Sequence, residues 1–249
     1  MLYGETCNRR RRRPGDISSE VGYAARVGSF FYGAFTNESV MMISDLDRRG
    51  YSREAERSLE LFLHYQGTVA LPGNFTTRQG ILYGAGGYEM GDYNQHHGWA
   101  LWGLAEHYWY TRDRRWMEHA APHILAACHW IINERKATMK LDAQGKRVPE
   151  YGLLPAGGLE DVQDFWYWLS TNTFSWWGLQ SAARALQDFG HPEGSALVKE
   201  AEAYRQDTLG NFRKASIRSP VVRLRDGTYI PQFPSNIHTR GRSHGWIRE

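Results

Sequence analysis

A helical hairpin that recurs three times is the feature that most constrains the fold of this chain. In each copy, an apolar helix rich in small residues is followed by a short polar turn and a more charged helix. The copies span residues 37–66, 96–135 and 171–215. A recurring unit of this size is typical of an array or toroid of hairpins. In a toroid the N-terminal ends of the inner helices, and the loops before them, gather at one end, where we expect a site.

The turns within the hairpins carry residues that end one helix and start the next. Gly50 suits a helix C-cap and Ser52 an N-cap. Residues 111–113 have the same place in the second hairpin and residues 190–192 in the third, where Pro192 suits a first helical turn. We therefore predict an all-α fold of antiparallel helix pairs.

Long loops precede the inner helices, at residues 67–95, 136–170 and 220–243. Loops of this length in a compact domain are usually functional. The last loop places short apolar stretches on either side of Asp226-Gly227, which predicts a short β-hairpin.

No linker or low-complexity segment divides the chain, so we predict one domain over residues 1–249 with an irregular lead-in at residues 1–30. Residues 241–249 resemble the entry to a fourth inner helix. We therefore expect a partial toroid of about three hairpins and the start of a fourth. The truncated edge would expose an apolar face and could promote self-association.

Composition limits the classes of partner. The chain has 249 residues, 41% hydrophobic and 23% charged, as in ordinary globular proteins. Its net charge of +3 is too small to indicate nucleic acid, and the arginine run at residues 9–13 has no second basic cluster to support it.

No apolar run reaches the roughly 18 residues of a membrane span, and the start lacks the apolar segment of a signal peptide. In a partial chain this leaves the compartment undetermined. We expect neither nucleic acid nor membrane as a partner.

Three stretches carry a resemblance to known enzymes: GYSREAERSLELFLHYQ (50–66), GWALWGLAEHYWYTRDRRWMEHAAPHILAACHWI (98–131) and GLLPAGGLEDVQDFWYWLSTNTFSWWGLQSAARAL (152–186). They are similar to segments of the six-hairpin (α/α)6-barrel glycosidases, such as glucoamylases, trehalases and family 63 α-glucosidases. The resemblance implies an (α/α)6 toroid and a glycoside hydrolase that cleaves a glycosidic bond by acid/base catalysis with inversion. The substrate would be an oligosaccharide or glycoside, and no cofactor or metal is implied.

The loop before the third inner helix carries the candidate general acid. Glycoside hydrolysis needs two carboxyl groups that flank the scissile bond. Glu160 and Asp161 precede a run of aromatic residues, and apolar walls raise a carboxyl pKa. The resemblance places the acid here, so Glu160 and Asp161 are the catalytic candidates; the alternative is helix capping or a solvated loop. We expect the general base beyond Glu249, which would leave this chain inactive alone.

A second cluster precedes the second inner helix, in a glycine-rich loop where backbone can approach a ligand. Its candidate substrate-binding residues are Glu89, Asp92, Tyr93, His96 and His97. The alternative is that Asp92 or Asn94 caps the second inner helix. A metal at His96 and His97 is disfavoured because adjacent helical residues point about 100° apart.

The remaining candidates for substrate contact are Asp164, Trp166, Trp168, Asn172, Arg240, His244 and Trp246. The tryptophans could stack on a sugar ring or pack in the core, and Asn172 could bind a ligand or cap its helix. For Arg240 and His244 the alternative is a surface ion pair. Asp45 and Asp47, by contrast, are expected to be solvated.

A different class of function remains open. A noncatalytic helical toroid that binds carbohydrate, or a scaffold, could carry the same hairpins. Other toroid enzymes are less well supported, since the Asp-rich motifs of terpene cyclases are absent from the sequence.

Overall fold

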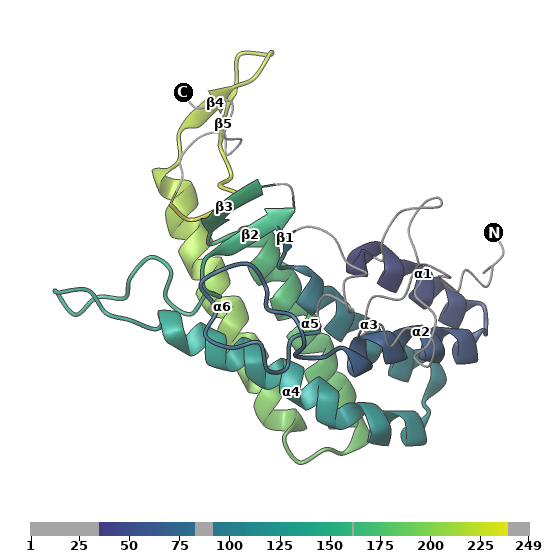
Figure 1. Cartoon of the computed structure of the whole chain (residues 1–249). Coiled ribbons are helices and arrows are strands. Elements are labelled where there is room, and N and C mark those ends of the chain that lie inside the picture. Colours follow the sequence, from purple (N-terminus) through teal and green to yellow (C-terminus); the bar gives the residue numbers. More distant parts are fainter. Residues whose placement is uncertain (1–34, 83–91, 161, 239–249) are drawn as a thin grey trace, which may run out of the picture.

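The computed structural model describes residues 35–82, 92–160 and 162–238. The predicted hairpins are confirmed as three consecutive pairs of helices (Figure 1). The pairs are α1 (Thr36–Arg48) with α2 (Ser52–His64), α3 (His96–Thr111) with α4 (Arg114–Thr138), and α5 (Leu169–Phe189) with α6 (Gly194–Arg218).

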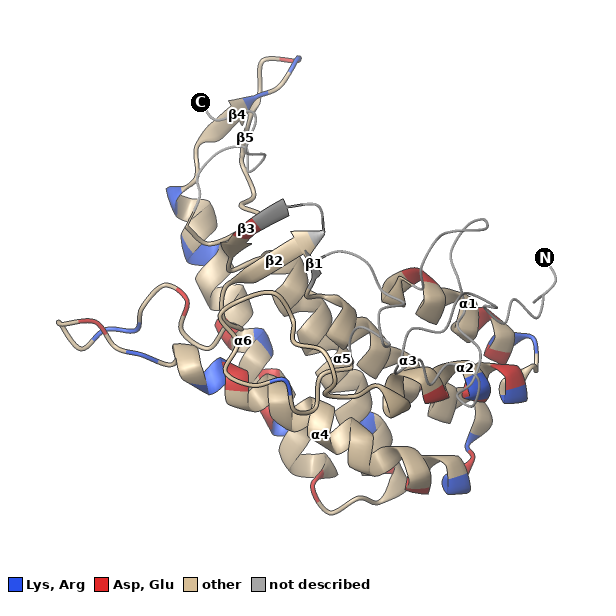
Figure 2. Cartoon of the chain, in the orientation of Figure 1, with Lys and Arg blue, Asp and Glu red and all other residues tan. Residues whose placement is uncertain are grey.

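The first helices of the three pairs lie side by side. Helix α3 contacts α1 on one side and α5 on the other, and each second helix packs against its own partner. One large apolar core runs through all three pairs. Figure 2 shows that α3 and α5 carry few charged residues, whereas α1, α2, α4, α6 and the turns carry more. Few charges are expected for α3 and α5, because helices packed on several sides are largely buried.

The turns explain where the helices end. Asp113 caps α4 by accepting hydrogen bonds from the backbone N–H groups of Arg115 and Trp116. Gly190 follows α5 with a φ of 92°, the left-handed conformation that glycine adopts most easily. The predicted N-cap at Ser52 is wrong by one residue, since Tyr51 is the N-cap of α2. Pro192 lies in the turn before α6 and not in its first turn.

Two glycines allow α3 and α5 to approach closely. A Cβ atom on Gly178 would lie 2.3 Å from the backbone oxygen of Gly98, and one on Gly98 would lie 2.3 Å from that of Phe174. Beside this contact the indoles of Trp102 and Trp177 stack with their centroids 4.5 Å apart. Any larger side chain at either glycine would push the two helices apart.

Two small sheets complete the fold. Strands β4 (Val221–Arg223) and β5 (Tyr229–Pro231) form the hairpin that the sequence predicts. Strands β1 (Asp92–Tyr93), β2 (Gly157–Glu160) and β3 (Val162–Trp166) form an antiparallel sheet in the order β1-β2-β3, which the sequence does not predict. Among the described helices, none combines the length and the apolar character needed to cross a membrane.

Candidate functional site

The three-stranded sheet lies where the chain enters α3 and α5 (Figure 1). Strand β1 leads into α3, and β3 leads into α5. In the register of β1 and β2, Asp92 lies opposite Glu160, and Tyr93 lies opposite Leu159. The two carboxylate-bearing loops are therefore neighbours in space. We call this sheet, with the segments that pair with it, the strand end of the fold.

Two further segments join the strand end. The backbone N–H of Asn74 donates to Ala156 O at 2.8 Å, and that of Gly158 donates to Pro72 O at 2.9 Å. From the other end of the chain, the N–H of Leu169 donates to Ser235 O at 2.8 Å. Segments from across the described chain thus converge at the entrance to α3 and α5.

One glycine makes this convergence possible. A Cβ atom on Gly157 would lie 2.0 Å from Nδ2 of Asn94, and this amide donates to Pro72 O at 3.0 Å. Asn94 is therefore the side chain that holds the 72–74 segment against the start of α3. The sequence suggested Asn94 only as a possible cap of this helix, and the N-cap of α3 is instead Gln95, with no side-chain cap.

Five of the predicted site residues, Glu89, Asp161, Arg240, His244 and Trp246, lie outside the described residues. Asp92, Tyr93 and Glu160 are placed by the strand register above. The other six lie on α3, β3 and α5 or just before α5, and they differ in how accessible they are.

His97 is buried with both ring nitrogens engaged. Its Nδ1 accepts a hydrogen bond from the Leu82 N–H at 3.0 Å, and its Nε2 donates to Ala127 O at 3.2 Å. Burial lowers the pKa of His97 to about 4. A proton on Nδ1 would also oppose the Leu82 N–H, so the ring is neutral and ties the loop to α4. His96 beside it is buried as well. The part of the chain that the structure describes contains no group of three side chains suited to hold a metal ion.

Asn172 and Trp168 also direct their polar atoms into the fold. Oδ1 of Asn172 accepts from the Leu154 N–H at 2.8 Å and the Tyr204 hydroxyl at 2.9 Å, while its Nδ2 donates to Trp168 O. Trp168 donates its indole N–H to Gly157 O at 2.9 Å. Both side chains are buried and brace the strand end.

The accessible candidates lie on β3. Asp164 is exposed, and Trp166 is half-buried. Phe165, between them, is also exposed. The carboxylate of Asp164 is thus open to solvent at the strand end, and two aromatic residues follow it in the sequence.

Two adjacent charged residues of α4 organise the long loops, and neither was a site residue predicted from the sequence. The fully buried carboxylate of Glu134 accepts from the N–H and hydroxyl of Thr76 and from the N–H of Thr77. The fully buried guanidinium of Arg135 donates to Gly152 O at 2.8 Å and pairs with Asp207 at 2.9 Å. Burial lowers the pKa of Arg135. Glu134 and Arg135 follow the buried residues Trp130 and Ile131 by four positions each. This helical spacing could have predicted that they lie on an inward face.

The expectation of a solvated Asp47 is wrong. Asp47 is buried, and its carboxylate contacts Nδ1 of the equally buried His107 at 2.9 Å. Asp45, in contrast, is exposed and pairs with Arg49. The periodicity of α1 turns Asp47 toward α3, where a polar partner compensates for its burial.

A scan against models of protein families gives no match to this chain, and a search of curated proteins finds no significant relative.

Proposed function

We propose that this chain forms part of a glycoside hydrolase of the (α/α)6-toroid kind, with the strand end as its substrate-binding face. The observation that carries the proposal is the register that sets Asp92 opposite Glu160. It brings both carboxylate-bearing loops to the entrance of two inner helices, where a toroid concentrates its ligand contacts. The resemblance of residues 152–186 to glycosidase segments supports the same assignment.

In this proposal Glu160 or Asp161 is the general acid that protonates the glycosidic oxygen. Asp92 binds sugar hydroxyl groups from the neighbouring strand, and Phe165 and Trp166 offer flat apolar surfaces to a sugar ring. An inverting reaction requires a second carboxylate about 6.5–9.5 Å from the acid, with room for water between them. We assign this base to none of the described residues.

Carbohydrate binding without catalysis is the second candidate. It is favoured by His97, Trp168 and Asn172, three predicted site residues whose polar atoms form buried hydrogen bonds within the fold. These atoms are therefore not available for catalysis. The accessible side chains would then bind a sugar, and no general base would be needed.

Hydrolysis of a panel of aryl glycosides and disaccharides, together with calorimetric binding of the same sugars, tests both candidates. The variants are Glu160→Gln and Asp161→Asn, with Glu202→Gln on exposed α6 as the control. Loss of turnover by about a thousandfold or more in one variant, with unchanged circular dichroism, supports the hydrolase. Turnover is measured on the full-length gene product, because the general base is expected beyond Glu249. Binding without turnover in that unaltered product supports the second candidate. Absence of both contradicts both.

A further inference from the structure

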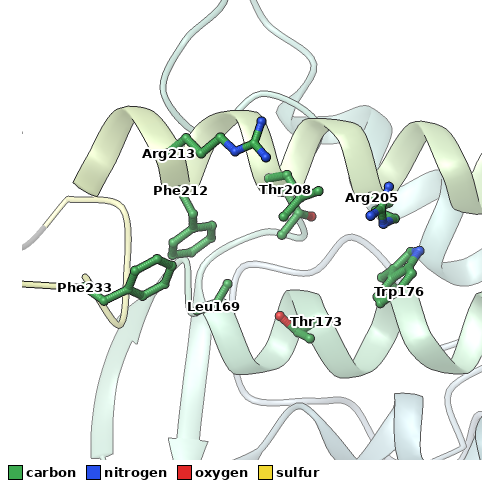
Figure 3. Close-up of a pocket in the computed structure, with 9 residues that line it drawn as sticks. Leu169, Thr173, Trp176, Arg205, Thr208, Phe212, Arg213 and Phe233 are labelled. Carbon is green, nitrogen blue, oxygen red and sulfur yellow. The ribbon is translucent and has the colours of Figure 1, made fainter. Parts of the chain in front are cut away.

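Two hollows adjoin α6, and they differ in chemistry. The first lies between α5 and α6, has a volume of about 230 Å³ and is mostly apolar, with Trp176, Phe212 and Phe233 in its wall (Figure 3). The second lies between the last turns of α6 and residues 147–149, and its volume is about 380 Å³. Sites for small molecules typically measure about 300–1,000 Å³, so the second hollow is large enough for one.

Three cations line the second hollow, which we call the cationic recess. Arg147 comes from the loop that follows α4, and Lys214 and Arg218 come from α6. Among the described residues that line the recess, none is acidic and none is aromatic. The remaining lining residues are Asn211 and the aliphatic Val148, Pro149 and Ile217. Positive charge on a concave surface raises the local concentration of anions, so the recess favours an anionic ligand.

The surroundings of the recess are also rich in positive charge. Between Asp207 and Asp226 the sequence contains five Lys and Arg residues and no Asp or Glu. Figure 2 shows cations on the last turns of α6 and on the loop between α4 and β2. These two stretches lie far apart in the sequence, and the fold brings them to the two sides of one recess.

Two carboxylates lie beside the recess, and both have partners. Asp207 pairs with the buried guanidinium of Arg135 at 2.9 Å and lies 3.4 Å from that of Arg147. Glu150 lies 3.6 Å from Nε2 of His238. Neither carboxylate forms an ion pair with the two cations that α6 contributes, so the positive charge of these cations is not neutralised from within the described fold.

The two sides of the recess differ in how firmly their cations are held. On the loop side, the guanidinium of Arg147 lies 4.2 Å from the ring centroid of Tyr151, and Asn211 donates to Tyr151 O at 2.8 Å. On α6, Nε of Arg218 donates to Lys214 O at 3.3 Å, and neither side chain pairs with a carboxylate of the described residues. A braced loop therefore faces two cations that are available to a ligand.

We propose that the cationic recess binds a sugar that carries a phosphate, sulfate or carboxylate group, at a site separate from the strand end. The anionic group would accept charge-assisted hydrogen bonds from Arg147, Lys214 and Arg218. The aliphatic side chains of Val148 and Ile217 would cover the apolar face of the sugar ring. The choice of a sugar as the carrier rests on the proposed function, whereas the choice of an anion rests on the recess alone. A nucleic acid fits less well, because no aromatic ring lines the recess for base stacking.

Calorimetric titration of the chain with glucose 6-phosphate, glucose and inorganic phosphate tests the proposal. We expect glucose 6-phosphate to bind most tightly, and its binding to weaken as NaCl is added, because the cations are exposed. Lys214→Gln should weaken this binding by about three- to fivefold. Arg218→Gln should act in the same direction. Lys199→Gln removes the same charge from an exposed position on the same helix and should leave the affinity unchanged.

Four results would overturn the proposal. Glucose 6-phosphate could fail to bind, or Lys214→Gln and Lys199→Gln could have equal effects. Inorganic phosphate that binds as tightly as glucose 6-phosphate would exclude the sugar as part of the ligand. An oligodeoxythymidylate that binds more tightly than glucose 6-phosphate, and does so through Lys214, would favour nucleic acid instead. These outcomes are distinct from a failure of the proposed function, which is read from turnover in Glu160→Gln and Asp161→Asn.

Discussion

The two sides of α5 differ in how completely they are packed. Toward α3, Gly98 and Gly178 bring the backbones together, and Trp177 stacks with Trp102. Away from α3, Trp176 lines an open apolar pocket. Neighbouring tryptophans thus lie on opposite sides of one helix: Trp177 is packed against aromatic partners, and Trp176 lines a pocket.

The largest effect should come from breaking the closed side. In Gly178→Ala the new Cβ would meet the backbone oxygen of Gly98, which no side-chain rotation can relieve. We expect the free energy of unfolding in urea to fall by about 3 kcal/mol. Gly210→Ala is the matched control, because a Cβ on this α6 glycine meets nothing within 4 Å. It should stabilise the chain by about 0.5–1 kcal/mol. If Gly178→Ala and Gly210→Ala changed the free energy of unfolding equally, α3 and α5 could move apart without cost.

A pH effect of nearly the same size should arise at the start of the closed side, from His97. Its folded pKa of about 4 lies below the unfolded value, so the unfolded state binds more protons between about pH 4 and 6.5. Stability should therefore be fully present above about pH 6.5 and fall by on the order of 3 kcal/mol as the pH drops to about 4.

The matched variant is His97→Gln, which keeps one acceptor and one donor but does not titrate. Urea unfolding at several pH values should show a flatter profile for this variant. An unchanged slope would show that other groups cause the loss of stability in acid.

Asn172 tests whether the strand end depends on α5 for support. Asn172→Ala leaves the Leu154 N–H and the Tyr204 hydroxyl without their acceptor, and we expect a loss of about 2 kcal/mol in urea unfolding. Asn133→Ala, on the exposed surface of α4, should change stability by less than about 0.5 kcal/mol. If Asn172→Ala unfolds like the unaltered chain but loses sugar binding, the residue is a ligand contact instead.

The smallest effects compare the two tryptophans directly. Trp177→Leu gives up the ring contacts with Trp99 and Trp102 and should cost about 1 kcal/mol. Trp176→Leu should cost less in urea unfolding, because Trp176 lines the open pocket. An equal cost would show that the two sides of α5 contribute equally to stability.

The helices and their turns could be predicted because their signals are local. The apolar periodicity, Gly50 and Gly190 all act within a few residues of where they stand, and the β4–β5 hairpin follows from its own turn. The three-stranded sheet could not be predicted in this way. Strand β1 has only two residues, and its partner comes from a different loop, so neither alternation nor turn chemistry marks it.

The candidate site was predicted in pieces. The sequence drew attention to the loops of Asp92 and Glu160 but contained no signal that they pair. It also proposed His97 and Asn172 for ligand contact, and the structure bonds both within the fold. A polar side chain before a helix looks the same in sequence whether it meets a sugar or a distant backbone group. Catalysis and the toroid closure stay predictions.

The adjacent pair on α4 affects the order of folding. Glu134 reaches Thr76, 58 positions away, and Arg135 reaches Asp207, 72 positions away. Neither contact can form before α4 exists and has met its distant partner, because loop closure over such separations costs entropy first. We therefore expect these contacts to form after the transition state. Substitutions at Glu134 or Arg135 would then shorten the lifetime of the native state while leaving the rate of refolding nearly unchanged.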